Sequence, residues 1–104
     1  MDDTQLTECL QSVGKQLFVR CFWTFRAASL GRLSQAACAQ TILNQGHQIT
    51  LDEVLLRIRR AQEIFATGQE RAVLALVMAT RHPAERRLRE EAEEICARFD
   101  RLYS

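Results

Sequence analysis

Apolar residues recur every three or four positions along most of this chain, beginning near the N-terminus. Over positions 4–28 they would draw one face of a helix, formed by Leu6, Leu10, Val13, Leu17, Cys21 and Phe25. Because an α-helix turns once in about 3.6 residues, this spacing predicts one amphipathic helix over about 4–28. Gly14 falls inside it and is expected to weaken it by about 1 kcal/mol relative to alanine. Positions 17–25 are rich in aromatic and β-branched residues, so a strand is the alternative there, although no partner strand is found elsewhere.

The middle of the chain predicts two more helices with recognisable ends. The run LSQAACAQTILNQ favours a helix over about 33–45, and Gly46 follows where a left-handed C-terminal cap belongs. Thr50 and Glu53 have the spacing of a capping box, in which each side chain accepts a hydrogen bond from the other residue's backbone amide. A helix over about 51–66 is therefore predicted. Its apolar stripe consists of Leu51, Val54, Leu55, Ile58, Ala61, Ile64 and Phe65.

The C-terminal third predicts a fourth and a fifth helix. Gly68 ends the preceding helix, and the run QERAVLALVMATR is apolar nearly all round, which is typical of a buried central helix or of half an interface. Pro83 suits the first turn of the next helix. That helix carries an apolar seam formed by Leu88, Ala92, Ile95, Phe99 and Leu102. The fold class predicted from these patterns is all-α, a small bundle of four to five helices in a single domain over residues 1–104.

Composition and charge narrow the classes of function. The 104 residues are 47% hydrophobic, which is enough for one core. Lys plus Arg number 14 against 13 Asp plus Glu, whereas nucleic-acid-binding proteins are usually strongly basic. No apolar run approaches the ~20 residues that cross a bilayer, and the start MDDTQLTECL lacks the apolar stretch of a signal peptide. We expect a cytoplasmic protein with no membrane segment, and the preference for arginine over lysine is typical of a GC-rich bacterial gene.

Candidate chemistry is sparse. The cysteines Cys9, Cys21, Cys38 and Cys96 are irregularly spaced and form no C-x-x-C, so we interpret them as reduced thiols rather than as a metal site or a redox pair. His47 and His82 stand at positions expected for loop or cap residues. No glycine-rich phosphate loop is present, and no nucleophile is accompanied by a recognisable base. The sequence therefore predicts no catalytic residue, no metal and no cofactor, and a protein that is not an enzyme.

A dimeric DNA-binding regulator remains the alternative function. The helix pair over 33–66 would act as a helix-turn-helix, with Arg57, Arg59 and Arg60 contacting nucleic acid. Two observations disfavour it. The supposed reading helix opens with Asp52 and Glu53, and the connection before it is longer than the three or four residues usual for the motif.

The preferred hypothesis is association with another protein, in an adaptor, an inhibitor or a chaperone-like partner. Two places carry more apolar surface than one helix face can bury, namely the aromatic run 18–25 and the seam of the last helix. The candidate interface residues are Phe18, Phe22, Trp23, Leu88, Ala92, Ile95, Phe99 and Leu102. A self-complementary seam would make the protein a homodimer. The alternative for the aromatic run is that the other helices of the same domain cover it, so that it is buried in the core.

Overall fold

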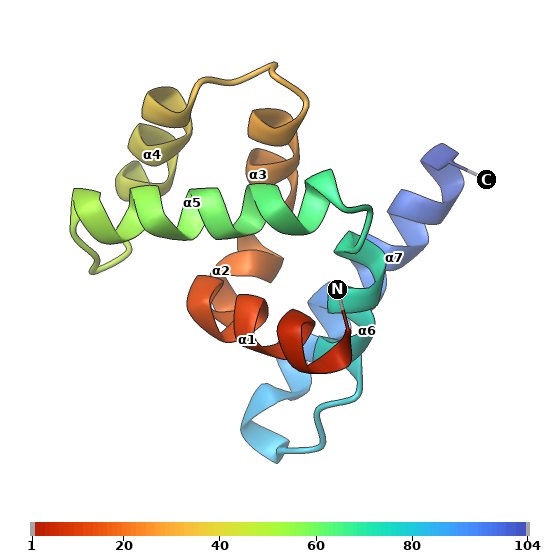
Figure 1. Cartoon of the computed structure of the whole chain (residues 1–104). Coiled ribbons are helices and arrows are strands. Elements are labelled where there is room, and N and C mark those ends of the chain that lie inside the picture. Colours follow the sequence, from red (N-terminus) through yellow and green to blue (C-terminus); the bar gives the residue numbers. More distant parts are fainter. Residues whose placement is uncertain (1, 104) are drawn as a thin grey trace.

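Seven α-helices and one short 3₁₀ helix make up residues 2–103, the part of the chain that this computed structural model describes (Figure 1). They are α1 (Asp3–Val13), α2 (Lys15–Arg20), α3 (Phe22–Ser29), α4 (Gln35–Asn44), α5 (Leu51–Ala66), α6 (Glu70–Met78), η1 (Pro83–Glu85) and α7 (Arg86–Tyr103). The predicted all-α fold is confirmed, but with more helices than the four to five expected. No strand occurs within 2–103, so the segment 17–25 is helical.

The long first helix predicted over 4–28 is wrong, because the chain breaks twice within it. Gly14 adopts φ +91° and ψ 126°, a conformation outside the helix, and separates α1 from α2. Cys21, at φ −109°, separates α2 from α3. A continuous helix of that length would be about 37 Å long, whereas the longest dimension of the molecule is 32 Å. The breaks let three short helices fold around a common core instead of projecting from it.

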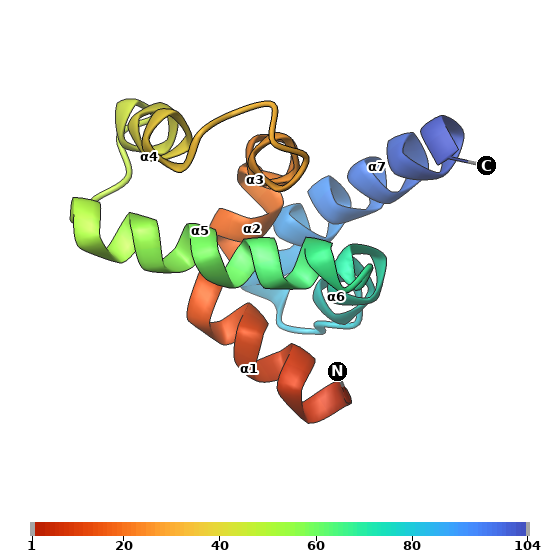
Figure 2. The same cartoon turned by 45° about the horizontal axis from the view of Figure 1, so that its top comes forward.

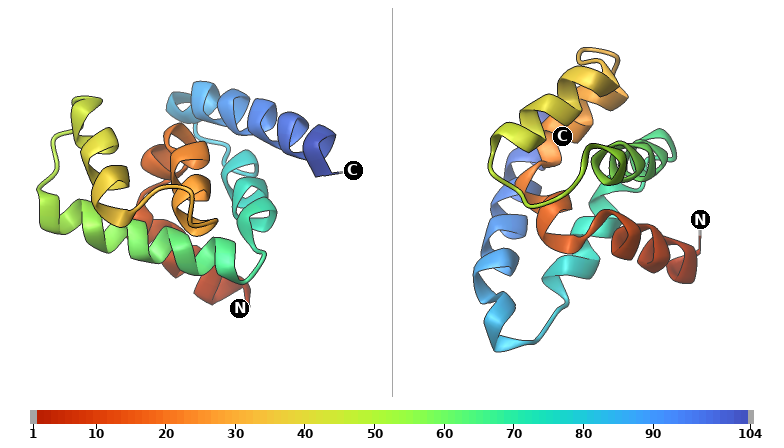
Figure 3. Two further views of the ribbon diagram at one scale, coloured as in Figure 1. Left: turned by 90° about the horizontal axis from the view of Figure 1, so that it is seen from above. Right: turned by 90° about the vertical axis from the view of Figure 1, so that its left-hand side faces the viewer.

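Helix α5 is the element around which the N-terminal half is arranged. It contacts α1 on one side and both α3 and α4 on the other (Figure 2). Helix α7 packs against α6 and α2. Seen from above, α2 and α3 lie between α5 and α7 (left panel of Figure 3), while the C-terminal end of α7 extends past its neighbours.

The core is centred on the aromatic residues of α2 and α3. Phe18, Phe22 and Phe25 are fully buried. The Phe22 ring has its centroid 5.7 Å from that of Phe18, 5.2 Å from that of Phe65 and 6.1 Å from that of Phe99. The contacts with Phe18 and Phe99 are edge-to-face, and such contacts add to the free energy gained from burial alone. Phe22 thereby links α3 to both α5 and α7.

The predicted helix ends agree with the structure except at two points. Gly46 follows α4 at φ +86°, as expected of a left-handed cap, and Thr50 Oγ1 accepts the Glu53 amide at 3.2 Å. The second bond of a capping box, from the Thr50 amide to the Glu53 carboxylate, is not among the hydrogen bonds of residues 2–103. Only half of the predicted capping box therefore forms. Leu51 is 54% exposed rather than core-facing, although Val54 in the same turn of α5 is fully buried. No helix within 2–103 combines the length and apolar character that a bilayer crossing requires.

Candidate functional site

Four of the eight predicted interface residues are core residues of their own chain. Phe18, Phe22, Leu88 and Ala92 are each at most 6% exposed. The two phenylalanines lie between α5 and α7, while Leu88 and Ala92 belong to the face of α7 that packs on α6 and α2. The structure thus corrects their assignment to a surface, and for the aromatic run it favours the alternative that the domain wraps it.

The other four lie at the surface on α3 and α7, and we call them the Trp23 patch: Trp23, Ile95, Phe99 and Leu102. Trp23, Ile95 and Phe99 are half-buried, with part of each side chain packed on the core. Leu102, one turn after Phe99 on α7, is 59% exposed. Trp23 and Phe99 both contact the ring of Phe22, so the patch is anchored to the centre of the core.

Two arginines flank the indole ring of Trp23. The guanidinium carbon of Arg98 lies 5.0 Å from the ring centroid, and that of Arg26 lies 5.9 Å from it. Contacts of this kind are attractive because the face of the indole is electron-rich. The spacing of Glu94 and Arg98 would have suited an ion pair along the helix, but Arg98 turns to Trp23, and no ion pair between Arg98 and Glu94 occurs within 2–103. Sequence periodicity could not have revealed this choice, because Trp23 comes from another helix.

Shallow grooves border the patch on both sides. One, of about 280 Å³, is lined by Val19, Arg20, Trp23, Glu91, Glu94 and Ile95. The other, of about 210 Å³, is lined by Arg26, Ser29, Leu30, Phe65, Ala66, Glu70 and Phe99. Leu30 is 50% exposed and was missed from the sequence, since it stands at the end of α3 where no periodicity marks it. The surface around Trp23 is therefore apolar, grooved and edged by charges of both signs.

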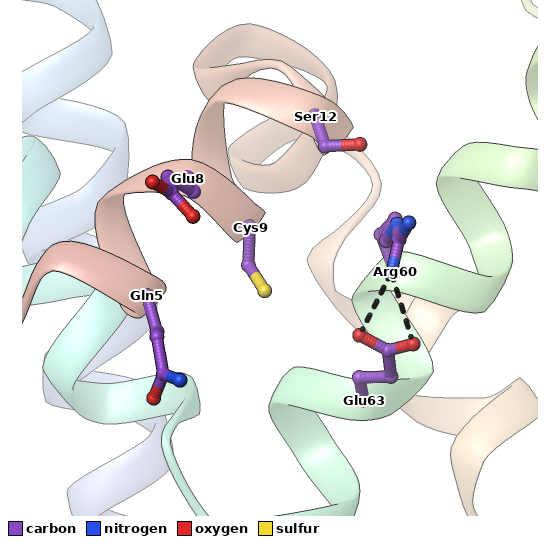
Figure 4. Close-up of a pocket in the computed structure, with 6 residues that line it drawn as sticks. All are labelled: Gln5, Glu8, Cys9, Ser12, Arg60 and Glu63. Atoms are coloured by element: carbon purple, nitrogen blue, oxygen red, sulfur yellow. Dashed lines mark hydrogen bonds and ion pairs between the residues drawn. The ribbon is translucent and has the colours of Figure 1, made fainter. Parts of the chain in front are cut away.

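A further groove, of about 360 Å³, lies between α1 and α5 (Figure 4). Gln5, Glu8, Cys9 and Ser12 of α1 face Arg60 and Glu63 of α5 across it. Arg60 Nη1 and Glu63 Oε1 are 3.2 Å apart and bind each other. No histidine lines this groove.

The three arginines of the DNA-binding alternative have separate surroundings. Arg57 Nη1 donates to the carbonyl oxygen of Val13 at 3.4 Å, where α1 ends, so it supports the break at Gly14. Arg60 pairs with Glu63, and Arg59 is exposed. The exposed N-terminal turn of α5 carries Asp52 and Glu53. This end of the helix would meet phosphates with negative charge, which disfavours the alternative.

The buried cysteines are held as thiols. Burial raises the pKa of Cys21 and of Cys38 to about 11, and the proximity of Cys38 raises that of Cys21 further. The Cys21 thiol donates to Gln45 Oε1 at 3.4 Å. Burial also raises the pKa of Cys96. Since the thiolate is the reactive form, these side chains act as small apolar core residues rather than as nucleophiles.

The two histidines make local contacts within the chain. His82 Nδ1 accepts the Ala84 amide at 3.2 Å and caps η1, while His47 Nε2 lies 3.2 Å from Gln45 Oε1. Within residues 2–103 no three His, Cys, Asp or Glu side chains gather in a way that could hold a metal ion. No protein-family model, curated protein or solved structure matches this chain. The Trp23 patch is therefore the candidate functional site on geometry alone.

Proposed function

We propose that this protein is a small non-catalytic adaptor or regulatory protein that acts by binding another protein through the Trp23 patch. The observation that carries the proposal is the combination of a half-buried tryptophan between two arginines with a leucine that is 59% exposed nearby. Tryptophan and arginine are the residues in which interface binding energy is concentrated most often.

The anchoring of the patch supports this proposal. Trp23 packs edge-on against the buried ring of Phe22, with centroids 5.0 Å apart, so its position is set before any partner arrives. A side chain that is already ordered loses little conformational entropy on binding. The charged residues around the patch would supply the polar rim that protein interfaces usually have.

The setting we propose is the bacterial cytoplasm, in a protein that works as an adaptor, an inhibitor or a chaperone-like partner. The near-neutral charge and the scarcity of lysine, represented by Lys15 alone, are compatible with that setting.

A comparative capture experiment tests the proposal. Tagged wild-type protein and the variant Leu102→Glu are used to capture proteins from the native host, and mass spectrometry identifies what each retains. Leu56→Glu is the matched control, since Leu56 is 48% exposed on α5, outside the patch. We expect a partner that wild type and Leu56→Glu retain and Leu102→Glu loses. If the three proteins retain the same set, the Trp23 patch is not the binding surface.

A further inference from the structure

We infer that the exposed flank of α7 binds α7 of a second copy of this chain in an antiparallel pair. The inference rests on the proposed function, because it names a second copy as one partner of the surface beside Trp23. It concerns a stripe of four charged residues that borders the patch: Glu91, Glu94, Arg98 and Arg101. We call these four residues the charged stripe.

The spacing and sign of these charges make the stripe self-complementary. The four residues are separated by three, four and three positions, so they lie along one side of the helix. The spacing reads the same in both directions, while the charges run from two negative to two positive. In an antiparallel pair with its two-fold axis at the level of Cys96, Glu91 meets Arg101 of the second copy and Glu94 meets its Arg98. A parallel pair would set like charges against each other.

The stripe is available for such contacts. Glu94, Arg98 and Arg101 are exposed, and neither Glu94 nor Arg101 has an ion-pair partner within residues 2–103. Glu91 is half-buried and lies 3.8 Å from both Arg20 and Arg87, near the outer limit of an ion pair, so its side chain would have to turn outward to meet Arg101 of the second copy. The C-terminal end of α7 also extends beyond the neighbouring helices (Figure 2), which leaves room for a second helix alongside it.

Apolar residues beside the stripe would close the contact. Leu102 and Ile95 border it on the side of Trp23. In the antiparallel register, Leu102 of the second copy comes opposite position 90, within about one helical turn of the groove lined by Val19, Trp23 and Ile95. A leucine that is 59% exposed in one copy thus reaches apolar surface on the other. This contact differs from the predicted seam, because Leu88 and Ala92 of that seam are buried within their own chain.

The dimer should be weak and sensitive to salt. Stable interfaces bury roughly 800 Å² on each partner, and a stripe about 15 Å long covers less. Ion pairs between exposed side chains are screened as ionic strength rises. We therefore expect an equilibrium between monomer and dimer that depends on protein concentration and shifts toward monomer in high salt.

Sedimentation equilibrium on the full chain tests the pairing, at about 10 mM and about 500 mM salt to vary the screening length. Wild type should form dimers at low salt. Glu94→Arg places like charges together twice by symmetry and should raise the dissociation constant about tenfold or more. Glu93→Arg is the matched control, with the same change of charge on a side of α7 away from the stripe, and should have little effect. Equal weakening by the two variants would overturn the inference.

Mixing two variants gives the decisive measurement. Copies with Glu94→Arg repel each other, as do copies with Arg98→Glu, but a mixed dimer restores both opposite-charge contacts. We expect each variant alone to be monomeric and the mixture to form dimers. A mixture that stays monomeric, or a wild type that is monomeric at high concentration and low salt, refutes self-pairing. Capture of a foreign protein that depends on Leu102 would then still support the proposed function, whereas dimers without any such capture would count against it.

Discussion

Replacing Gly14 by alanine distinguishes the observed chain break at this residue from the continuous helix that periodicity predicts over 4–28. The two arrangements predict changes of opposite sign in the free energy of unfolding. Inside a continuous helix, Gly14→Ala would stabilise the protein by about 1 kcal/mol, since alanine is the better helix former. In the structure Gly14 is the break between α1 and α2, at φ +91° and ψ 126°. That conformation is accessible to glycine and strained for any other residue.

Two structural costs set the magnitude of the loss. Residues forced into such a backbone region cost about 1–3 kcal/mol each. A β-carbon at position 14 would also lie 3.3 Å from Nη1 of Arg57, which must shift and loosen its bond to the Val13 carbonyl. We therefore expect Gly14→Ala to lower the free energy of unfolding by about 2–3 kcal/mol, a drop in Tm of roughly 10 °C for a domain of this size.

Urea unfolding measures this loss with two independent probes. Far-ultraviolet circular dichroism reports the helices, and fluorescence reports Trp23, the one tryptophan in the sequence. Gly46→Ala is the control, since Gly46 also has a positive φ, +86°, but no atom lies within 4 Å of its added β-carbon. It should lose only about 1–2 kcal/mol. A Gly14→Ala protein as stable as wild type, or more stable, would refute the proposed role of the break.

Three further predictions follow from the core and the charge distribution. Phe22→Ala should lower the free energy of unfolding by about 4–5 kcal/mol in urea titrations, because it empties a fully buried site with four ring contacts. Truncation of the exposed Leu56 to alanine is the control and should cost less than about 1 kcal/mol. Because the pKa of Cys21 and of Cys38 is about 11 in the folded chain, above the ordinary value of 9.0, unfolded thiols ionise first as pH rises. The contribution of the two thiols to stability should be constant below about pH 8 and fall between about pH 9 and 11, by roughly 2–3 kcal/mol for a shift of this size, with a shallower fall in Cys38→Ala, and an identical slope in that variant would contradict the assignment. Electrophoretic shift assays with a random-site DNA library at about 150 mM salt should select no sequence, and recovery of a palindromic consensus would revive the DNA-binding alternative.

The sequence predicted the helices well wherever local chemistry decides the outcome. Gly46 and Thr50 mark ends that depend on their own backbone and side-chain bonds, and both lie where expected. The break at Gly14 could not be read in the same way. Glycine is compatible with either a weakened helix or a left-handed kink, and what selects the kink is packing against α5, including the Arg57 bond to Val13. Periodicity carries no information about such distant partners.

The candidate site was predictable in part for the same reason. The seam of α7 was correctly recognised as apolar, but its spacing could not show that Leu88 and Ala92 face the core while Leu102 remains exposed. That division depends on where α6 and α2 end beneath α7. The position of Arg98 over Trp23 joins residues 75 positions apart in the sequence, so only the folded chain reveals it.

The packing of α7 against α2 and α6 also has a consequence for synthesis of the chain. Until residues 86–103 have left the ribosome, the apolar faces of those two helices have nothing to cover them, although α1, α3, α4 and α5 can already associate. Helix α7 thus completes the core around segments that were translated before it. Until α7 is in place, the chain exposes apolar surface that chaperones and proteases can bind, so the lifetime of the nascent protein depends on how quickly α7 emerges and folds.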